Sequence, residues 1–348
     1  MYMFRTLLIL MFLTSTALAD KYENIPYLSP GSVDAVLDVH VPSSGVEVGV
    51  PTILFIHGGG WYSGDKSDSP ELWMPLIVEG YNVIACNYTL SSAVSPSYPQ
   101  AVHDVKAVVR WIRSNGVDEY GLSPTIAVMG PSAGGHLTEM LATTDGVEIF
   151  EPLPAPDKGY AVQASMPFFG LCDFVLQVKS GGNTYPFREF LGGPLNEKTR
   201  PTYIEASPIT WISSDDAPMF HVHGFDDPIH FYEQAVVMNE ALNDIEVYSS
   251  MHIYEGGHAF ADIGYKDFMG YEAASAILLD QIPILLSASR DGDINYNGSI
   301  EVEDLLAVIS SWGDCPDLPI DCPADIDGSG VVDVTDLLIV VGNWGPCE

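Results

Sequence analysis

Basic residues are scarce in this chain of 348 residues. Lysine and arginine together number 13, against 47 aspartates and glutamates, which gives a formal net charge of −34 at pH 7. A surface this acidic repels phosphate backbones and anionic lipid headgroups. The composition therefore argues against nucleic-acid binding. Adaptation of the surface to a salty medium is an equally good explanation of the bulk charge.

Long hydrophobic runs are lacking beyond the first 19 residues. Segment 1–19 has one positive charge at Arg5, an apolar run from Leu7 to Leu13 and a small-x-small site ending at Ala19. This order is typical of a secretory signal peptide. The run is short of the roughly 20 residues that span a bilayer, so cleavage is favoured over an uncleaved anchor. We expect a secreted protein, whether extracellular, cell-surface or periplasmic, with no membrane span after cleavage.

Cysteines number only five. Cys86 and Cys172 stand alone in apolar segments, which is typical of buried thiols. Cys315, Cys322 and Cys347 lie near the end of the chain, and two of them can pair in an oxidising compartment. The sequence does not decide which two.

Short apolar runs alternate with helix-length amphipathic segments across residues 20–285. The runs predict strands at Thr52–His57, Asn82–Asn87, Thr125–Met129, Ala161–Phe168, Met219–His223 and Glu246–Tyr254. Apolar spacings of three and four residues predict helices at Gln100–Asn115, Ala133–Ala142, Tyr232–Leu242 and Tyr265–Leu279. Strands and helices in turn indicate an α/β domain with a doubly wound, mostly parallel sheet. The stretch Phe174–Trp211, rich in Gly, Pro and aromatic residues, breaks this rhythm and is a candidate insertion over a site.

A G-x-S-x-G motif runs from Gly130 to Gly134, with Ser132 at its centre. It follows a predicted strand directly and opens a predicted helix, the context in which this motif presents a nucleophilic serine. The start of that helix, with its positive dipole end, would face a developing oxyanion, and the Ala133 N–H is a candidate donor. This placement favours a nucleophile over a serine in an ordinary glycine-rich turn.

A second glycine-rich loop, His57-Gly58-Gly59-Gly60-Trp61, follows an earlier predicted strand. Glycines let backbone N–H groups approach a substrate closely. The loop is therefore suited to an oxyanion hole that works together with Ser132.

A nucleophilic serine needs a histidine base and an acid that orients it, and both follow the serine along the chain in such sheets. His258 lies just after the last predicted strand and is the candidate base, whereas His252 lies inside that strand and is expected to be structural. Asp226 and Asp227 both follow the preceding strand. Asp227, which precedes a proline, is the preferred acid, and Asp226 stays open.

Two further sets of residues have alternative interpretations. Asp173 also follows a strand but stands in a Phe-rich context, and we expect it to be structural. His221, His223 and His230 are spaced unusually for a zinc triad, and a zinc site is kept as an alternative.

Five segments carry a family resemblance: HGGGWYSGDK, SYPQAVHDVKAVVRWIR, GPSAGGHL, HGFDDP and EGGHAF. Residues 51–282 resemble the esterase/lipase group of α/β-hydrolases, above all its hormone-sensitive-lipase-like and feruloyl/acetyl-xylan esterase branches. The resemblance implies a triad of Ser132, Asp227 and His258. It also implies oxyanion donors from the backbone N–H groups of Gly59, Gly60 and Ala133, and no cofactor for catalysis.

The composition changes near Ser287. From Arg290 to Glu348 there are thirteen acidic residues and one basic residue, and the segment repeats itself at an offset of 32 residues. Asp304-Leu305-Leu306 matches Asp336-Leu337-Leu338, and Trp312 matches Trp344. A constant offset indicates an internal duplication, so residues 286–348 are expected to form a second, small domain.

Each repeat also carries a calcium-loop pattern, with oxygen ligands at loop positions 1, 3, 5 and 12, a glycine at position 6 and a backbone carbonyl at position 7. The candidate ligands are Asp293, Asn295, Asn297, Ser299 and Asp304 in the first repeat, and Asp325, Asp327, Ser329, Val331 and Asp336 in the second. Ser299 and Val331 would ligate through their carbonyl oxygens. The pattern predicts two structural Ca²⁺ ions.

The duplicated loops resemble a dockerin, a small all-α calcium-loop module. This resemblance implies a cohesin-like or cell-surface partner. Together the two halves predict a secreted serine carboxylic-ester hydrolase that removes acetyl or feruloyl groups from a polysaccharide. The alternatives are a general esterase or lipase for small or lipid esters and, from another class, a non-catalytic adhesion or scaffold protein.

Overall fold

The computed structural model describes residues 19–28, 35–43, 50–151, 159–182, 184–259 and 270–288. In the C-terminal segment it describes residues 292, 294, 299–300, 302–315, 324–326, 331–342 and 344–346. The predicted signal segment, apart from Ala19, lies outside the described residues. Within them, no helix is long and apolar enough to cross a membrane.

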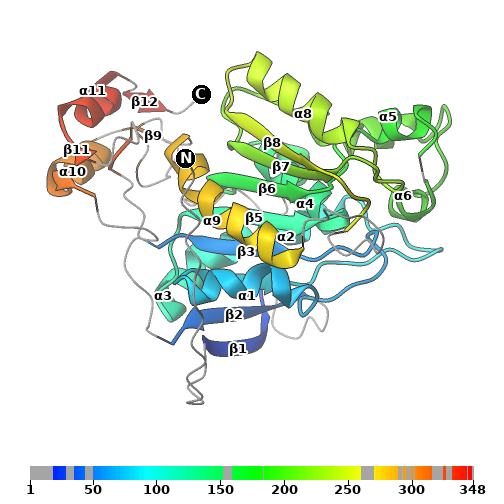
Figure 1. Cartoon of the computed structure of the whole chain (residues 1–348), viewed down its shortest axis with the longest axis horizontal. Helices are drawn as coiled ribbons and strands as arrows, with labels where there is room; N and C mark the ends of the chain where they lie inside the picture. The colour runs from blue at the N-terminus through cyan, green and yellow to red at the C-terminus, as the bar shows by residue number, and fades with distance from the viewer. Residues whose placement is uncertain are drawn as a thin grey trace.

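The described residues before 290 build one sheet of eight strands in the order β1-β2-β4-β3-β5-β6-β7-β8 (Figure 1). The strands are β1 (Ala19–Pro26), β2 (Val36–Pro42), β3 (Thr52–Ile56), β4 (Asn82–Cys86), β5 (Ile126–Pro131), β6 (Ala164–Phe168), β7 (Met219–Gly224) and β8 (Ser249–Tyr254). Strands β3 to β8 run parallel, whereas β2 is antiparallel to both β1 and β4. The predicted mostly parallel sheet is confirmed.

Helices cover both faces of this sheet. On one face α1 (Pro70–Val78) and α9 (Tyr271–Ala288) pack against a core that includes Phe55 and Val222. On the other face lie α2 (Gln100–Trp111), α4 (Ala133–Thr143) and α8 (Glu233–Asp244), over a core that includes Leu54 and Met219. Alternate residues of the strands thus enter opposite cores, because side chains along a strand point to opposite faces. Both faces are buried, as a parallel sheet requires.

Several elements differ from the sequence expectation. The strands β1 and β2 were not predicted; β1 is largely exposed, and β2 has the buried polar residues Asp38 and His40 within its apolar run. The helix predicted at Gln100–Asn115 ends as α2 at Trp111 and continues as a π-helical turn, η1 (Ile112–Gly116), followed by the short α3 (Val117–Tyr120). Helix α9 begins and ends later than the predicted Tyr265–Leu279, and residues 260–269 lie outside the described chain.

The predicted insertion Phe174–Trp211 contains three short helices and a 3₁₀ turn. They are α5 (Phe174–Lys179), α6 (Tyr185–Phe190), α7 (Arg200–Glu205) and η3 (Pro208–Thr210). A further 3₁₀ turn, η2 (Glu148–Phe150), precedes β6. Four aromatic side chains of the insertion, Phe174, Phe187, Phe190 and Tyr203, are fully buried, whereas Tyr185 is exposed. The composition of the insertion therefore produces a packed helical segment rather than an open loop.

The acidic C-terminal segment contains α10 (Val302–Ser310) and α11 (Val334–Gly342), which lie at the left of Figure 1. Two short ladders join the repeats reciprocally. In one, β10 (Gly313–Asp314) of the first repeat pairs with β11 (Val331–Val332) of the second. In the other, β12 (Gly345–Pro346) pairs with β9 (Ser299–Ile300). Six buried side chains from the two repeats form a separate core: Ile300, Val308, Ala324, Ile326, Val332 and Val340.

Candidate active site

Ser132 stands on a sharp turn between β5 and α4, as the motif predicts. Its backbone has φ 58° and ψ −116°, outside the regions that L-residues ordinarily occupy. The turn is tight because the neighbouring strand crosses close by: a Cβ built on Gly134 would lie 2.1 Å from the carbonyl oxygen of Ile56. Only glycine fits there, so the motif's last glycine lets the serine turn sit against β3.

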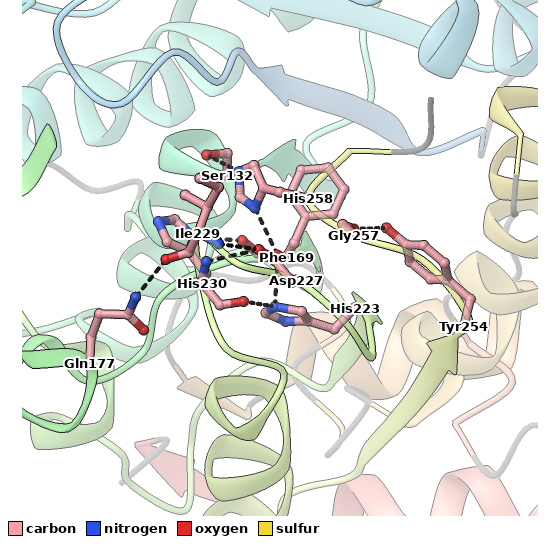
Figure 2. Close-up of polar contacts among 10 residues, drawn as sticks. All are labelled: Ser132, Phe169, Gln177, His223, Asp227, Ile229, His230, Tyr254, Gly257 and His258. Carbon is pink, nitrogen blue, oxygen red and sulfur yellow. Dashed lines mark hydrogen bonds and ion pairs between the residues drawn. The ribbon is translucent and has the colours of Figure 1, made fainter. Parts of the chain in front are cut away.

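The side chains of Ser132, His258 and Asp227 form a continuous hydrogen-bonded series (Figure 2). His258 Nε2 lies 2.9 Å from Ser132 Oγ, and His258 Nδ1 lies 2.7 Å from Asp227 Oδ2. Because a carboxylate only accepts, the Nδ1 proton is donated to Asp227, and Nε2 is left to accept the serine proton. The structure therefore brings together three residues predicted from far-separated segments.

Asp227 is held in the turn after β7 by its own backbone. Its Oδ1 atom accepts from the N–H of Ile229 at 2.7 Å and of His230 at 2.9 Å. Burial raises the pKa of this carboxyl, but hydrogen bonds from His223 and His258 outweigh it and hold the pKa below its usual range. Asp227 is thus a buried anion at neutral pH. Asp226 is exposed, and its side chain takes no place in the series.

The glycine-rich loop after β3 borders the same cavity as the serine. This cavity of about 590 Å³ is lined by Gly58, Gly59, Gly60, Ser132 and His258, among others. Gly59 has φ 107°, and a Cβ there would lie 2.0 Å from the Ser63 carbonyl oxygen, so no other residue fits this bend. Ala133, the third predicted donor, follows Ser132 as the first residue of α4. The arrangement leaves room for a carbonyl group beside Ser132 Oγ.

An aromatic cluster anchors the glycine-rich loop to the insertion. Trp61 is fully buried and stacks on Phe190 with ring centroids 4.8 Å apart. Its indole N–H donates to His136 Nδ1 at 3.2 Å, and His136 Nε2 donates to the Ala206 carbonyl at 2.8 Å. The histidine is thereby fixed in one tautomer, and burial lowers its pKa to about 4. The loop, α4 and the insertion are locked to one another at this point.

The remaining sequence candidates lie elsewhere. Asp173 caps α5, accepting from the N–H groups of Val175 and Leu176, which agrees with a structural role. His252 is an exposed residue of β8. Of the three histidines considered for zinc, His221 faces Glu139, whereas His223 and His230 make hydrogen bonds near Asp227. In the part of the chain that the structure describes, no three His, Cys, Asp or Glu side chains are grouped to hold a metal.

The sequence did not indicate a place beside the catalytic residues for three residues near the cavity, two of which were considered only as zinc ligands. His223 lies 3.3 Å from Asp227 Oδ2, and the His230 ring lies 4.9 Å from the His258 ring. Tyr62 lines the cavity and is 44% exposed. His223 opens the same HGFDDP segment as Asp227, so its spacing of four residues from the acid was an available signal.

Comparison with known proteins places the chain in a family. A family model described as BD-FAE matches residues 37–242, more than half of the chain. The chain belongs to the BD-FAE family. It is 32% identical over 223 residues to "Probable carboxylic ester hydrolase LipM" and 28% identical over 230 residues to "Esterase LipQ", both of Mycobacterium tuberculosis. These matches cover 62% and 65% of this chain but 50% and 53% of the relatives, so the chain spans about half of their length.

Solved structures of other esterases share the fold of this chain. A truncated carbohydrate esterase from gut microbiota matches with a TM-score of 0.63 and 23% identity, covering 70% of this chain and 91% of the other. Thermogutta terrifontis esterase 2 matches with a TM-score of 0.61 and 21% identity, covering 80% and 98%. At these identities the likeness establishes the α/β-hydrolase fold.

Proposed function

We propose that this BD-FAE protein is a serine carboxylic-ester hydrolase that works through Ser132, His258 and Asp227. The observation that carries the proposal is the hydrogen-bonded series of 2.9 Å and 2.7 Å contacts at the rim of the cavity. His258 Nε2 takes the Ser132 proton as Oγ attacks the ester carbonyl. The buried Asp227 anion orients the imidazole and stabilises its protonated form. A non-catalytic scaffold has no need of such an arrangement.

The backbone N–H groups of Gly59, Gly60 and Ala133 are proposed to stabilise the oxyanion of the tetrahedral intermediate. When that intermediate collapses, His258 gives its proton to the leaving alcohol and an acyl-Ser132 remains. Water then attacks the acyl carbonyl, again with His258 as the base, and the carboxylic acid leaves. No cofactor takes part in these steps.

An ester-decorated polysaccharide, carrying acetyl or feruloyl groups, is the proposed substrate. Two observations support it. One protein of similar structure is a carbohydrate esterase from gut microbiota, and another, at 25% identity, is a bifunctional GH43-CE protein of Bacteroides eggerthii. In addition, exposed tyrosines stand at the cavity: Tyr62 lines it, and Tyr185, which is 63% exposed, lies with its ring centroid 6.5 Å from that of Tyr62. Such amphipathic rings suit the faces of sugars.

Relatives named simply as esterases favour the alternative of small-ester hydrolysis. A panel of acetylated xylan, methyl ferulate and p-nitrophenyl esters of rising chain length separates the two, with Ser132→Ala as the inactive control. We expect Tyr62→Ala and Tyr185→Ala to raise KM for acetylated xylan several-fold and to leave p-nitrophenyl acetate hydrolysis unchanged. Tyr248→Ala is the matched control, because Tyr248 is 40% exposed, close to the 44% of Tyr62, but directly precedes β8 and does not line the cavity. Absence of activity on both acetylated xylan and methyl ferulate would reject the polysaccharide substrate, and equal KM values in all three variants would reject the role of the two tyrosines.

For the C-terminal repeats we propose two structural Ca²⁺ ions. Asp304 and Asp336 occupy equivalent positions, are completely buried, and accept from the N–H groups of Ile294 and Ile326 at 2.8 and 2.6 Å. Asp325, also buried, begins the second loop. Buried carboxylates of this kind fit a hard divalent cation. The other proposed side-chain ligands, Asp293, Asn295, Asn297, Asp327 and Ser329, lie outside the described residues. Ser299 belongs to β9, which pairs with β12, and Val331 belongs to β11, which pairs with β10.

The same repeats are proposed to bind a cohesin-like partner. Large apolar side chains are exposed at positions that correspond between α10 and α11 and in the turns after them: Val302 and Val334, Leu306 and Leu338, Ile309 and Val341, and Trp312 and Trp344. Exposed apolar patches of this regularity mark interaction sites. Titration of a purified cohesin module by calorimetry tests the partner, and sedimentation tests self-association as the alternative.

Secretion is proposed on the strength of the N-terminal signal pattern. Ala19, the residue before the expected cleavage site, is the first residue of β1. N-terminal sequencing of the protein from the culture medium should begin at Asp20. A mature chain that still begins at Met1 would contradict cleavage.

A further inference from the structure

His223 is a buried residue with no step of its own in the proposed proton relay. It lies near the end of β7, with about 1% of its surface exposed. Its Nε2 atom lies 2.8 Å from the His230 carbonyl oxygen and 3.3 Å from Asp227 Oδ2 (Figure 2). His223 therefore contacts Oδ2 of Asp227, whereas the peptide donors bind Oδ1.

The protonation of the His223 ring follows from its partners. A carbonyl oxygen can only accept a hydrogen bond, so Nε2 must carry a proton. That N–H faces both the His230 carbonyl and the Asp227 carboxylate, and it is shared between them. The contact to Asp227 is thus a donor–acceptor contact rather than an incidental approach.

The carboxylate of Asp227 is consequently held at both oxygens. Oδ1 accepts the two peptide N–H groups of Ile229 and His230. Oδ2 faces two imidazole N–H groups, from His258 at 2.7 Å and from His223 at 3.3 Å. Four donors around one carboxylate define both its plane and its rotation. Without His223, Oδ2 would be held by His258 alone, the group that it has to orient.

We propose that His223 is a positioning residue that fixes Asp227 Oδ2 in the place from which it orients His258. This inference rests on the proposed function, because it assigns His223 to the machinery of that reaction. His223 does so from the rigid strand β7, whereas Asp227 itself lies in the turn that follows. The contact to the His230 carbonyl adds a second tie between this turn and the strand.

The expected pH effect has a definite sign. A donor to the ionised carboxylate lowers its pKa, so loss of the His223 N–H raises the pKa of Asp227. The Asp227 oxygen freed from His223 also concentrates its charge on His258, which favours the protonated imidazole. Activity needs neutral His258 and ionised Asp227. Both changes therefore move the acid limb of the pH profile to higher pH.

Other titratable groups around this site are common to all variants. His221 lies on the same face of β7 and contacts Glu139 of α4, and His230 packs against His258. Burial lowers the pKa values of His221 and His230 to about 3 and raises that of Glu139. Because each variant keeps these groups, their contributions cancel when the variants are compared with one another.

The matched pair of variants is His223→Gln and His223→Asn. The amide nitrogen of a glutamine reaches the position of Nε2, whereas the asparagine side chain is too short to place its amide nitrogen there. We expect the asparagine variant to lose about tenfold in kcat on p-nitrophenyl acetate, roughly one charged hydrogen bond, with little change in KM. Its acid limb should move up by about half a pH unit or more. The glutamine variant should stay within about twofold of the wild type.

Thermal unfolding of each variant separates positioning from folding. If the asparagine variant does not fold, His223→Leu, which fills the space without a donor, takes its place. An asparagine variant with the wild-type kcat and acid limb would overturn the proposal. Equal losses in the glutamine and asparagine variants would overturn it as well, because they would indicate a structural role alone.

Failure of the underlying function can be recognised separately. If Ser132→Ala retains full activity, the esterase mechanism is wrong whatever His223 does. In that case the downfield proton resonance of His258 Nδ1–H still reports on the contact. It should shift in the asparagine variant and stay in place in the glutamine variant, and an unchanged resonance in both would reject the positioning role.

Discussion

The α/β domain and the acidic C-terminal repeats position their functional residues in different ways. Around Ser132, two large cores on either face of an eight-stranded sheet of the described chain hold each turn in place. In the repeats, six buried side chains form the core among the described residues, and so small a core rarely stabilises a fold without added links. A disulfide that includes Cys315 provides one such link, and its possible partners, Cys322 and Cys347, lie outside the described residues. The sheet therefore needs no ligand for its geometry, whereas the repeats should need one.

The largest effect is expected from the acid of the series. Asp227→Asn leaves the shape of the side chain intact but favours the wrong tautomer of His258, which should lower kcat by about 10⁴-fold. Asp226→Asn, one residue earlier and exposed, should keep activity within about twofold. Steady-state hydrolysis of p-nitrophenyl acetate by both variants checks this. A comparable loss of activity in the two variants would show that activity depends on the structure of the turn rather than on the Asp227 carboxylate.

Removal of the two proposed Ca²⁺ ions should affect only the repeats. At free Ca²⁺ about a thousandfold above its Kd, each ion stabilises the folded form by about 4 kcal/mol. Chelation should therefore abolish or strongly lower the unfolding transition of residues 286–348, followed by calorimetry, while esterase activity persists. The same transition with and without chelator would argue against bound calcium. Loss of activity on chelation would break the contrast between the two regions.

Gly134→Ala should cost stability in the sheet because its Cβ would lie 2.1 Å from the Ile56 carbonyl oxygen. We expect a loss of about 2 kcal/mol in the free energy of unfolding, typical of overpacking, together with reduced activity as Ser132 shifts. Gly159→Ala, where the nearest atom lies 4.0 Å away, is the control. Urea unfolding measures the stability of both variants. An unchanged midpoint for Gly134→Ala would contradict the prediction, because it would mean that β3 and the serine turn move apart at little cost in free energy.

The smallest effect is expected at the exposed faces of the repeats. Leu306→Asp combined with Leu338→Asp should change the stability of the repeats by no more than about 0.5 kcal/mol, because both side chains are more than half exposed. The same pair should abolish binding of a cohesin module. Unfolding and calorimetric titration of the double variant test the two halves of this statement. Strong destabilisation would assign these side chains to folding instead of binding.

The sequence allowed most of the sheet and all three members of the hydrogen-bonded series to be predicted, for a physical reason. Buried parallel strands are continuous apolar runs, and functional residues follow them at one edge. The choice between Asp226 and Asp227 could not be made firmly, because one step along a turn reverses the direction of a side chain. Ile229 and His230 decide it by donating to Asp227.

Other features were hidden for equally physical reasons. Strand β1 is an exposed edge, so no buried run marks it, and the buried Asp38 and His40 interrupt the pattern of β2. The Lys66 ammonium pairs with Asp38 at 3.1 Å. These residues lie 28 positions apart, so a local sequence pattern could not predict their contact. His223 was considered as a metal ligand, although its neighbour in space, Asp227, follows it by only four residues in the sequence.

The reciprocal ladders of the repeats determine how this part of the chain can be truncated or expressed as a separate module. Strand β12 of the second repeat supplies the partner of β9 in the first, and β10 of the first supplies the partner of β11 in the second. Neither repeat therefore forms a complete module alone, because each ladder takes one strand from each repeat. A truncation that removes Gly345 and Pro346 would leave Ser299 and Ile300, at the other end of the same segment, without their strand partner.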